Sequence, residues 1–327
     1  MSQPLAKKVF SSHPGALLPY PDLVAVQFDS FRWFQETGLR ELLEEISPIR
    51  DHAGREFELH FKKCIFDEPK SSAEVAKDRS LTYEAPLRME VELVNLVTGK
   101  RMTQELYFGD FPIMTRKGTF IMSGVERVVI SQLVRSPGVY FTANYMRGEK
   151  FFGAKIIPNR GAWIEIESEP GGFVGMKIDR RRKVPVTAFL RTMGLETNEA
   201  MLGAFSHPLA RKLIEATLKS DPAASPSESY LEIYRRLRPG DLVTPQGAQS
   251  LIDGMFKRAD RYDLSEVGRY KANQTLGTSD ETSRLVTLRD LIRIIEEIAI
   301  RNADPRAEAN DIDHLGNRRL RAVGELL

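Results

Sequence analysis

The chain has 327 residues, of which 42% are hydrophobic and 28% are charged. This length allows about two domains, and the composition excludes a collagenous or wholly disordered chain. The 47 basic and 45 acidic residues leave a formal net charge of +2, so any contact with a nucleic acid must come from local basic patches. A single cysteine, Cys64, excludes an intrachain disulfide framework and a CxxC zinc site. With no apolar run near the roughly 18 residues that span a bilayer, we expect a soluble cytoplasmic protein.

The first part of the chain is predicted to mix helices and strands. Residues 1–19 are rich in proline and are expected to form a mobile leader. Apolar residues at helical spacing from Val24 to Phe34 predict a helix, which Gly38 is expected to interrupt before a second short helix. Alternating or apolar stretches predict strands over 57–61, 87–93, 102–108 and 119–123.

A second unit is predicted to begin near Pro137. Its first strands are expected over 151–157, 163–167 and 173–178. Helices follow, including one that begins at Thr244-Pro245 and one that a capping box of Thr287 and Asp290 starts. The stretch 220–229, with two prolines, is predicted to be a loop.

The end of the chain is dense in polar residues from Asp311 to Arg321. An apolar stripe of Leu320, Val323 and Leu327 then predicts the start of a helix. Two interpretations remain open here: a frayed terminal helix, or a fragment of a longer chain.

Few residues are candidates for metal binding or catalysis. His60 and Cys64 have a ligand spacing for a helix but lie in a predicted strand, which would separate them. Asp311 and Asp313 could hold Mg²⁺ or form ion pairs with neighbouring arginines. No glycine-rich phosphate loop and no nucleophile motif is found, so we assign no metal site and no catalytic residue.

Two features point toward nucleic acid. Arg180, Arg181, Arg182 and Lys183 are four consecutive cations, which form either a solvated charge run or a phosphate-contacting patch. Trp163 follows Arg160 and Gly161. Its ring is expected either in the core or exposed, where it would be a stacking platform for an unpaired base.

Several long motifs follow one another along the chain. The earlier ones are Phe108-Gly109-Asp110-Phe111-Pro112-Ile113-Met114-Thr115, the stretch 118–133, and Arg135-Ser136-Pro137-Gly138-Val139. The later ones are Ile157-Pro158, Arg160-Gly161-Ala162-Trp163, 178–183, Leu237-Arg238-Pro239-Gly240-Asp241, Arg261-Tyr262-Asp263-Leu264, Gly268-Arg269 and 311–319. In this order they resemble the N-terminal part of the bacterial RNA polymerase β subunit, of which the chain resembles about the first third.

The resemblance implies an α+β fold of two mixed domains. The protrusion would comprise 20–138 with 310–327, incomplete at its C-terminal side, and the lobe, 139–309, would be inserted into it. The chain would be a cytoplasmic, nucleoid-associated part of a nucleotidyltransferase, with the β′, α and sigma subunits and DNA as partners. The resemblance places the catalytic Mg²⁺ on β′, so this chain alone is expected to be inactive and to hold no cofactor.

The resemblance also implies site residues. Arg135, Trp163, Ile312, Asp313 and Arg318 match positions that grip bases of the non-template strand, with Trp163 stacking on one base and the next, a guanine, entering a pocket. Guanine presents two adjacent donors, N1–H and N2–H₂, which an acceptor-only carboxylate such as Asp313 can receive. The basic run 180–183 would contact phosphates.

Two further surfaces follow from the same resemblance. Arg127, Ile130 and Gln132 match positions at the border of the rifamycin pocket. The stretch Arg101-Met102-Thr103-Gln104-Glu105 matches an exposed strand edge onto which Tudor-like domains of the transcription-repair coupling factor and of CarD-type regulators add a strand. A protein-interaction platform is therefore the alternative to a DNA-holding role, and a stand-alone Mg²⁺ enzyme built on Asp311 and Asp313 ranks last.

Overall fold

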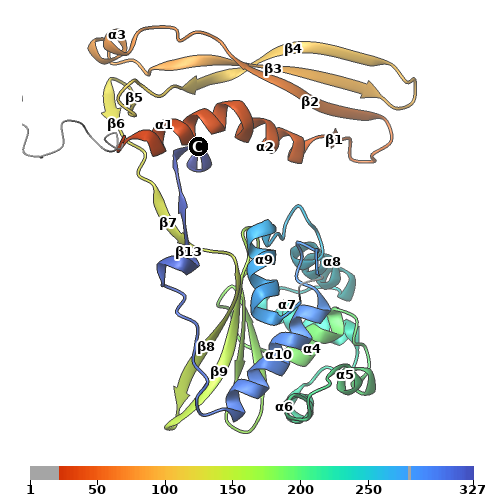
Figure 1. The fold of residues 1–327 in the computed structure, drawn as a ribbon. Coiled ribbons are helices and arrows are strands. Elements are labelled where there is room, and N and C mark those ends of the chain that lie inside the picture. The colour runs from red at the N-terminus through yellow and green to blue at the C-terminus, as the bar shows by residue number, and fades with distance from the viewer. Residues whose placement is uncertain (1–21, 279–280) are drawn as a thin grey trace, which may run out of the picture. The chain divides into compact units, whose positions relative to one another are not determined.

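The computed structural model describes residues 22–278 and 281–327, so the predicted leader lies outside the described part. The chain divides into two compact units (Figure 1). Unit 1 comprises the chain up to Leu133 together with Leu320–Leu327, and unit 2 comprises Val134–Arg319. Both units contain helices and strands, which confirms the α+β class. The insertion of a lobe into a protrusion stays an interpretation.

The elements of unit 1 and of the two connecting strands are α1 (Ala25–Trp33), η1 (Phe34–Gly38), α2 (Leu39–Ile46), β1 (Ile49–Arg50), β2 (Phe57–Phe66), α3 (Ala73–Asp78), β3 (Glu84–Asn95), β4 (Arg101–Pro112), β5 (Phe120–Met122), β6 (Val125–Arg127), β7 (Gln132–Arg135), β13 (Arg318–Arg321) and α11 (Val323–Leu326). Strands β1 to β4 form an antiparallel sheet in that order. The helices α1 and α2 lie against one face of this sheet (Figure 1), where Phe31 and Phe34 pack with Leu87 of β3.

The predicted interruption at Gly38 is wrong. The helix continues from α1 into α2 through the π-helical turn η1, and Gly38 keeps helical angles, with φ −61°. A Cβ atom at Gly38 would lie 2.9 Å from the Trp33 ring, so the glycine makes room for this indole.

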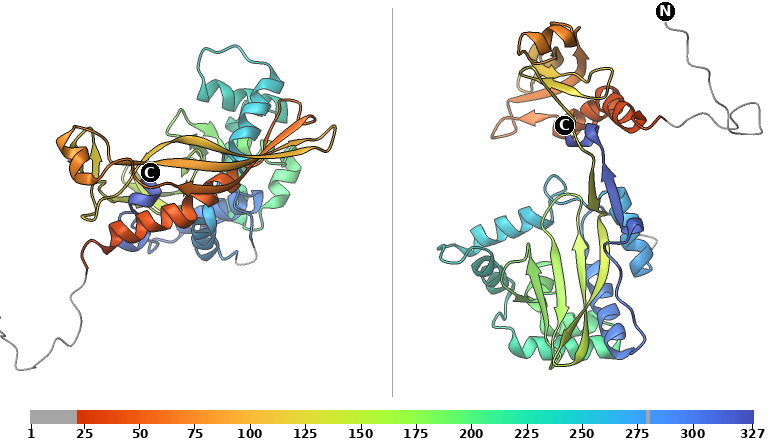
Figure 2. Two further views of the ribbon diagram at one scale, coloured as in Figure 1. Left: turned by 90° about the horizontal axis from the view of Figure 1, so that it is seen from above. Right: turned by 90° about the vertical axis from the view of Figure 1, so that its left-hand side faces the viewer.

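The elements of unit 2 are β8 (Gly138–Met146), β9 (Glu149–Ile157), β10 (Ile164–Ser168), β11 (Val174–Ile178), β12 (Val184–Pro185), α4 (Val186–Thr192), α5 (Asn198–Ala204), α6 (Pro208–Ser220), α7 (Pro226–Leu237), α8 (Pro245–Phe256), α9 (Ser265–Leu276), α10 (Leu288–Ala303) and η2 (Leu315–Asn317). Five strands form an antiparallel sheet in the order β12-β11-β10-β9-β8. The helices lie on one side of this sheet (Figure 1), which faces the viewer with the helices behind it in the right-hand view of Figure 2.

The two faces of this sheet differ because side chains alternate along a strand. Ile164 and Ile166 are fully buried and pack with Ile295 of α10 in the core of unit 2. The alternate residues of β10 form ion pairs: Glu165 pairs with Lys155, and Glu167 pairs with Lys177. The sheet therefore carries an apolar face toward the helices and a face of ion pairs away from them.

Two helix starts that were predicted from capping residues are confirmed. Thr244 caps α8, and Thr287 with Asp290 forms the predicted capping box of α10. The predicted loop over 220–229 is wrong in its second half, because Ser225 and Glu228 form another capping box and start α7 at Pro226. No helix among residues 22–278 and 281–327 is long and apolar enough to cross a membrane.

The prediction for the end of the chain is also wrong in part. Leu320 belongs to strand β13, which pairs with β7, and not to a helix. The terminal helix α11 begins only at Val323, whose side chain is fully buried in unit 1.

Candidate nucleic-acid interface

The loop that leads into β10 is fixed by pairing with a second loop. The N–H groups of Asn159 and Arg160 both donate to the carbonyl of Asp263, at 2.8 and 3.0 Å, and the N–H of Asp263 donates to the carbonyl of Arg160 at 2.9 Å. Gly161 follows with φ +119°, and a Cβ atom there would lie 2.7 Å from the Tyr262 ring. Only glycine fits both this angle and this approach. The backbone hydrogen bonds to Asp263 hold the loop that delivers the next residues.

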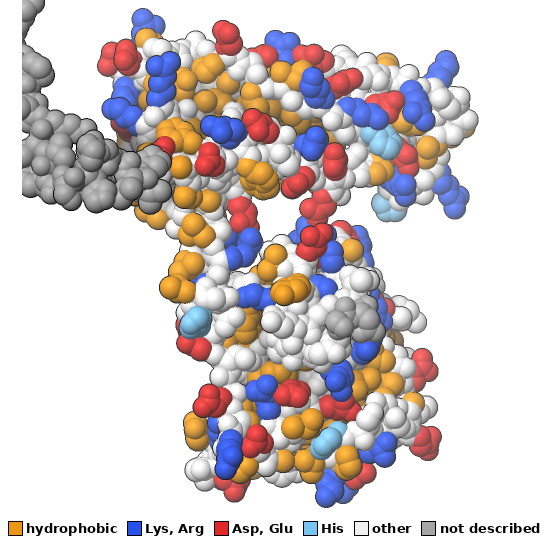
Figure 3. Space-filling view, viewed as in Figure 1, with side chains coloured by type: hydrophobic (Ala, Val, Ile, Leu, Met, Phe, Trp, Pro, Cys, Tyr) orange, Lys and Arg blue, Asp and Glu red, His pale blue; other side chains and the backbone are white. Residues whose placement is uncertain are grey.

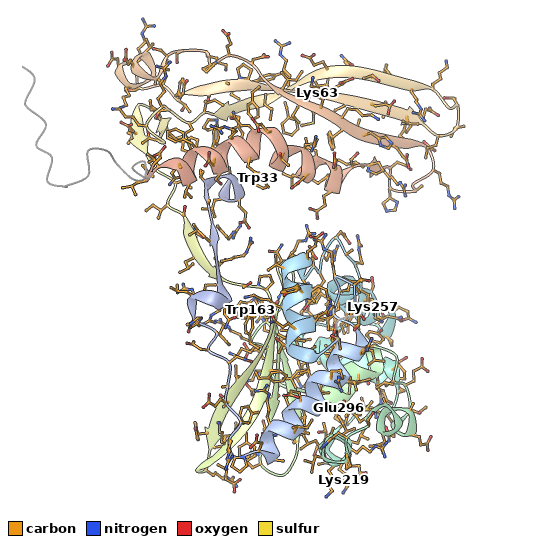
Figure 4. The ribbon with its side chains drawn as sticks, viewed as in Figure 1. Trp33, Lys63, Trp163, Lys219, Lys257 and Glu296 are labelled. Carbon is orange, nitrogen blue, oxygen red and sulfur yellow. The ribbon has the colours of Figure 1, made fainter. Side chains whose placement is uncertain are left out.

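Trp163 stands at the end of this loop, at one end of the five-stranded sheet (Figure 4). Its side chain is half-buried and does not belong to the fully buried core of unit 2. The guanidinium carbon of Arg180 lies 5.6 Å from the centroid of its ring. Trp163 thus combines a fixed backbone with a partly accessible indole.

The segment from Asp311 to Arg319 is held along the same unit by backbone contacts. Oδ1 of Asp311 accepts the N–H groups of Asp313 and His314, at 3.0 and 3.2 Å, which closes a tight turn. The N–H of Ser136 donates to the carbonyl of Asn317 at 2.9 Å, and Nζ of Lys271 donates to the carbonyl of Gly316 at the same distance.

This geometry brings Asp313 to Arg135. Nη2 and Nε of Arg135 lie 3.1 and 3.2 Å from Oδ1 of Asp313. The Asp313 side chain is 69% exposed, so its carboxylate remains accessible. The predicted neighbours Ile312 and Arg318 are half-buried.

The same segment is tied to the Trp163 loop. Nη2 of Arg319 donates to Oδ1 of Asn159 at 3.2 Å, four residues before Trp163. The end of unit 2 is therefore joined through side chains to the loop that precedes Trp163.

The Asp311 and Asp313 carboxylates do not favour Mg²⁺, because one caps a turn and the other pairs with an arginine. Within the described residues, no group of three or more His, Cys, Asp and Glu side chains is placed to hold a metal ion.

The four cations of the run 180–183 are not equivalent. Arg180, Arg181 and Arg182 are exposed, whereas Lys183 is half-buried and its Nζ lies 2.8 Å from Glu167 and in contact with Glu169. Burial opposes the charge on Lys183, but the hydrogen bonds to Glu167 and Glu169 outweigh it and raise the pKa of this ammonium. The charge of Lys183 is therefore balanced within the unit, and the arginines are the better candidates for phosphate.

Figure 3 shows one face of the molecule, on which Lys and Arg side chains are interspersed with Asp and Glu over the described residues of each unit. On this face, attraction to a nucleic acid must come from a few positioned groups.

The two other predicted surfaces lie in unit 1. Within the described part of the chain, strand β4 pairs only with β3 and forms an open edge of its sheet, and all residues from Arg101 to Phe108 are exposed. Arg127, Ile130 and Gln132 precede the boundary of this unit in the sequence by a few residues, and all three are exposed, Ile130 at 79%. Their assignment to a rifamycin border stays a prediction.

Sequence reasoning missed the residues that hold the site together. Asp179 bonds to both backbone polar groups of Trp163, and Asn159 receives Arg319. Asp179 directly precedes the basic run, but a lone aspartate after a strand gives no signal of a partner 16 residues earlier.

Comparisons with known proteins show which family the chain resembles. A family model described as RNA polymerase Rpb2, domain 2, matches residues 135–321, which include all the residues discussed above in unit 2. The chain is 43% identical over 342 residues to the DNA-directed RNA polymerase subunit beta of Chloroflexus aggregans and 45% identical over 309 residues to that of Syntrophomonas wolfei. In both cases 94% of this chain is covered, and the chain spans 28% of the length of the relative.

Proposed function

The chain belongs to the family of RNA polymerase Rpb2, domain 2, and from this premise we propose that it forms part of the β subunit of a DNA-directed RNA polymerase and holds the unpaired non-template strand. Its partners are then the β′, α and sigma subunits and promoter or downstream DNA. Phosphodiester formation belongs to groups outside this chain.

One observation carries the proposal: the indole of Trp163 is partly accessible on a loop that the pairing with Asp263 fixes. A flat aromatic face accepts any unpaired base, and its stacking contributes about 1–3 kcal/mol per base. A loop with one conformation adds little ordering cost when the base arrives.

The Arg135–Asp313 pair supports a guanine pocket beside this stack. The carboxylate accepts the two Watson–Crick donors of guanine, whereas adenine and cytosine present an acceptor at the ring nitrogen of this edge. Arg135 orients the carboxylate through its two contacts with Oδ1. The pair would thus read one base without any metal ion.

The test uses the assembled polymerase that carries this chain. Replacing Trp163 by Ala is expected to shorten the lifetime of the promoter open complex about 5- to 150-fold, the equivalent of 1–3 kcal/mol. The matched control is Trp33→Phe, which changes the other tryptophan, 43% exposed in unit 1, and is expected to leave the lifetime unchanged. An unchanged lifetime for Trp163→Ala would rule out the stacking role.

A second function, protein docking, is favoured by the open edge of β4. An edge strand offers unpaired N–H and C=O groups to an added strand, and the residues 101–105 lie on this edge. We propose that a Tudor-like domain of a transcription-repair coupling factor or a CarD-type regulator pairs here through backbone hydrogen bonds.

A further inference from the structure

A strained turn adjoins Trp163. Asp179 and Arg180 both have left-handed backbone angles, with φ +45° and +59°, and the N–H of Arg181 donates to the carbonyl of Ile178 at 2.9 Å. Two successive left-handed residues at the centre of a turn favour Asn and Gly, and arginine is a poor choice for such a position. Strain of this kind persists only where the surroundings fix it.

Trp163 itself fixes the turn. Its N–H donates to Oδ1 of Asp179 at 2.7 Å, and its carbonyl accepts the N–H of Asp179 at 2.9 Å. Aspartate tolerates the left-handed region better than most residues and supplies the acceptor that this geometry needs. Asp179 therefore joins the backbone of the stacking residue to the turn.

The turn in return places a cation on the indole. The guanidinium carbon of Arg180 lies 5.6 Å from the centroid of the Trp163 ring, within the range of about 6 Å for a cation–π contact. A planar guanidinium can lie on an aromatic ring while its N–H groups stay available to phosphate oxygens. The side chain of Arg180 is exposed, so such donors can reach a bound strand.

We propose that Asp179 and Arg180 complete the platform for the unpaired strand, which rests on the proposed function of Trp163. Asp179 is a positioning residue that holds the turn and the tryptophan in one arrangement. Arg180 restrains the indole and binds the phosphate beside the stacked base. The ligand is a single-stranded phosphodiester, and its base and its phosphate are recognised by adjacent residues.

The experiment measures, as functions of salt, the open-complex lifetime of the assembled polymerase and its equilibrium binding constant K for bubble DNA. Asp179→Ala removes the acceptor and is expected to shorten the lifetime at least 5-fold, whereas Asp179→Asn, which keeps an acceptor and tolerates the turn, restores it to within about 2-fold. Arg180→Gly relaxes the backbone, so it cannot act by unfolding the turn. It is expected to shorten the lifetime and to reduce the slope of log K against log salt by about 0.7.

The matched control is Arg147→Gly. Arg147 is also an exposed arginine with a left-handed angle, φ +52°. It lies in the hairpin between β8 and β9, whereas the loop to Trp163 leaves the opposite end of β9. This variant removes the same charge and the same strain and is expected to change neither lifetime nor slope.

The outcomes separate the two proposals. If Trp163→Ala shortens the lifetime while Asp179→Ala and Arg180→Gly match the wild type, the positioning role is wrong and the stacking role stands. If Trp163→Ala also has no effect, the proposed function fails. An effect of Arg147→Gly equal to that of Arg180→Gly would overturn the assignment of a specific phosphate contact.

Discussion

The guanidinium of Arg135 lies against one oxygen of the Asp313 carboxylate, although the two residues are 178 positions apart in the sequence. Nη2 and Nε both converge on Oδ1, and Oδ2 is 3.5 Å from Nη2. The less engaged Oδ2 is thus the oxygen best placed to accept donors from a ligand. The base preference proposed above follows because this carboxylate can only accept hydrogen bonds.

The first prediction concerns this carboxylate. Asp313→Ala is expected to remove the preference for guanine at one non-template position, a loss of about 1–3 kcal/mol of discrimination, and to leave overall DNA affinity nearly intact. The measurement compares the affinity of the assembled polymerase for bubble DNAs that carry G or A at that position. The control is Asp260→Ala, because Asp260 forms another exposed pair with an arginine, Arg258, in the same unit. Persistent discrimination in Asp313→Ala would show that the pocket lies elsewhere.

The second prediction concerns phosphate attraction by the basic run. The double change Arg181→Gln and Arg182→Gln is expected to reduce the slope of log K against log salt by about 0.7 for each phosphate that the arginines neutralise, without altering base preference. The control is Lys212→Gln with Lys219→Gln on α6, since both are exposed cations and Figure 4 shows Lys219 at the far end of unit 2 from Trp163. Equal slopes for both double variants would identify the run as a solvated surface.

The third prediction concerns strand addition at β4. Thr103→Ala is expected to leave docking of a Tudor-like domain nearly unchanged, because the contact uses the backbone. Thr103→Pro and Met102→Pro are compared, since N–H groups of successive residues point to opposite sides of a strand. One of the two variants should lose docking while circular dichroism keeps the wild-type spectrum. Binding by every folded variant, measured by calorimetry, would exclude strand addition at this edge.

The fourth prediction concerns the buried ion pair between Arg269 and Asp290, which we expect to stabilise the fold and not to bind DNA. Nη1 and Nη2 of Arg269 each lie 2.9 Å from an oxygen of Asp290, and the two side chains are 5% and 3% exposed. Arg269→Ala would leave the Asp290 charge buried and unpaired, so the free energy of unfolding should fall by about 3–5 kcal/mol. Arg258→Ala, which breaks an exposed pair, is expected to leave the urea midpoint nearly unchanged. Similar midpoints for both variants would mean that the Asp290 charge is solvated.

Sequence patterns predicted the elements well where one face of a strand or helix is buried. The strand expected over 87–93 lies within β3, and its alternating residues Leu87, Met89 and Val91 are the buried ones. The failures have local causes. Gly38 resembles a helix breaker but accommodates Trp33, and Pro226 resembles loop punctuation but occupies the first position of α7 after the cap Ser225.

The candidate site was predictable only in part. The residues alone indicated Trp163 as a possible stacking platform and Asp313 as a possible Mg²⁺ ligand, and only the family resemblance implied that the two act together on unpaired bases. The contacts that arrange them are long-range, such as Arg319 to Asn159 and Arg135 to Asp313, and no local periodicity encodes such pairs. The left-handed angle of Arg180 was equally hidden, since arginine gives no sign of a turn that favours glycine.

The most direct test of a platform for unpaired bases places 2-aminopurine in the non-template strand at the stacked position and measures its fluorescence in the open complex. We predict that the base is quenched with Trp163 present and becomes brighter in the assembled polymerase with Trp163→Ala, while Trp33→Phe stays as dim as the wild type. Equal fluorescence in all three enzymes would contradict stacking on Trp163.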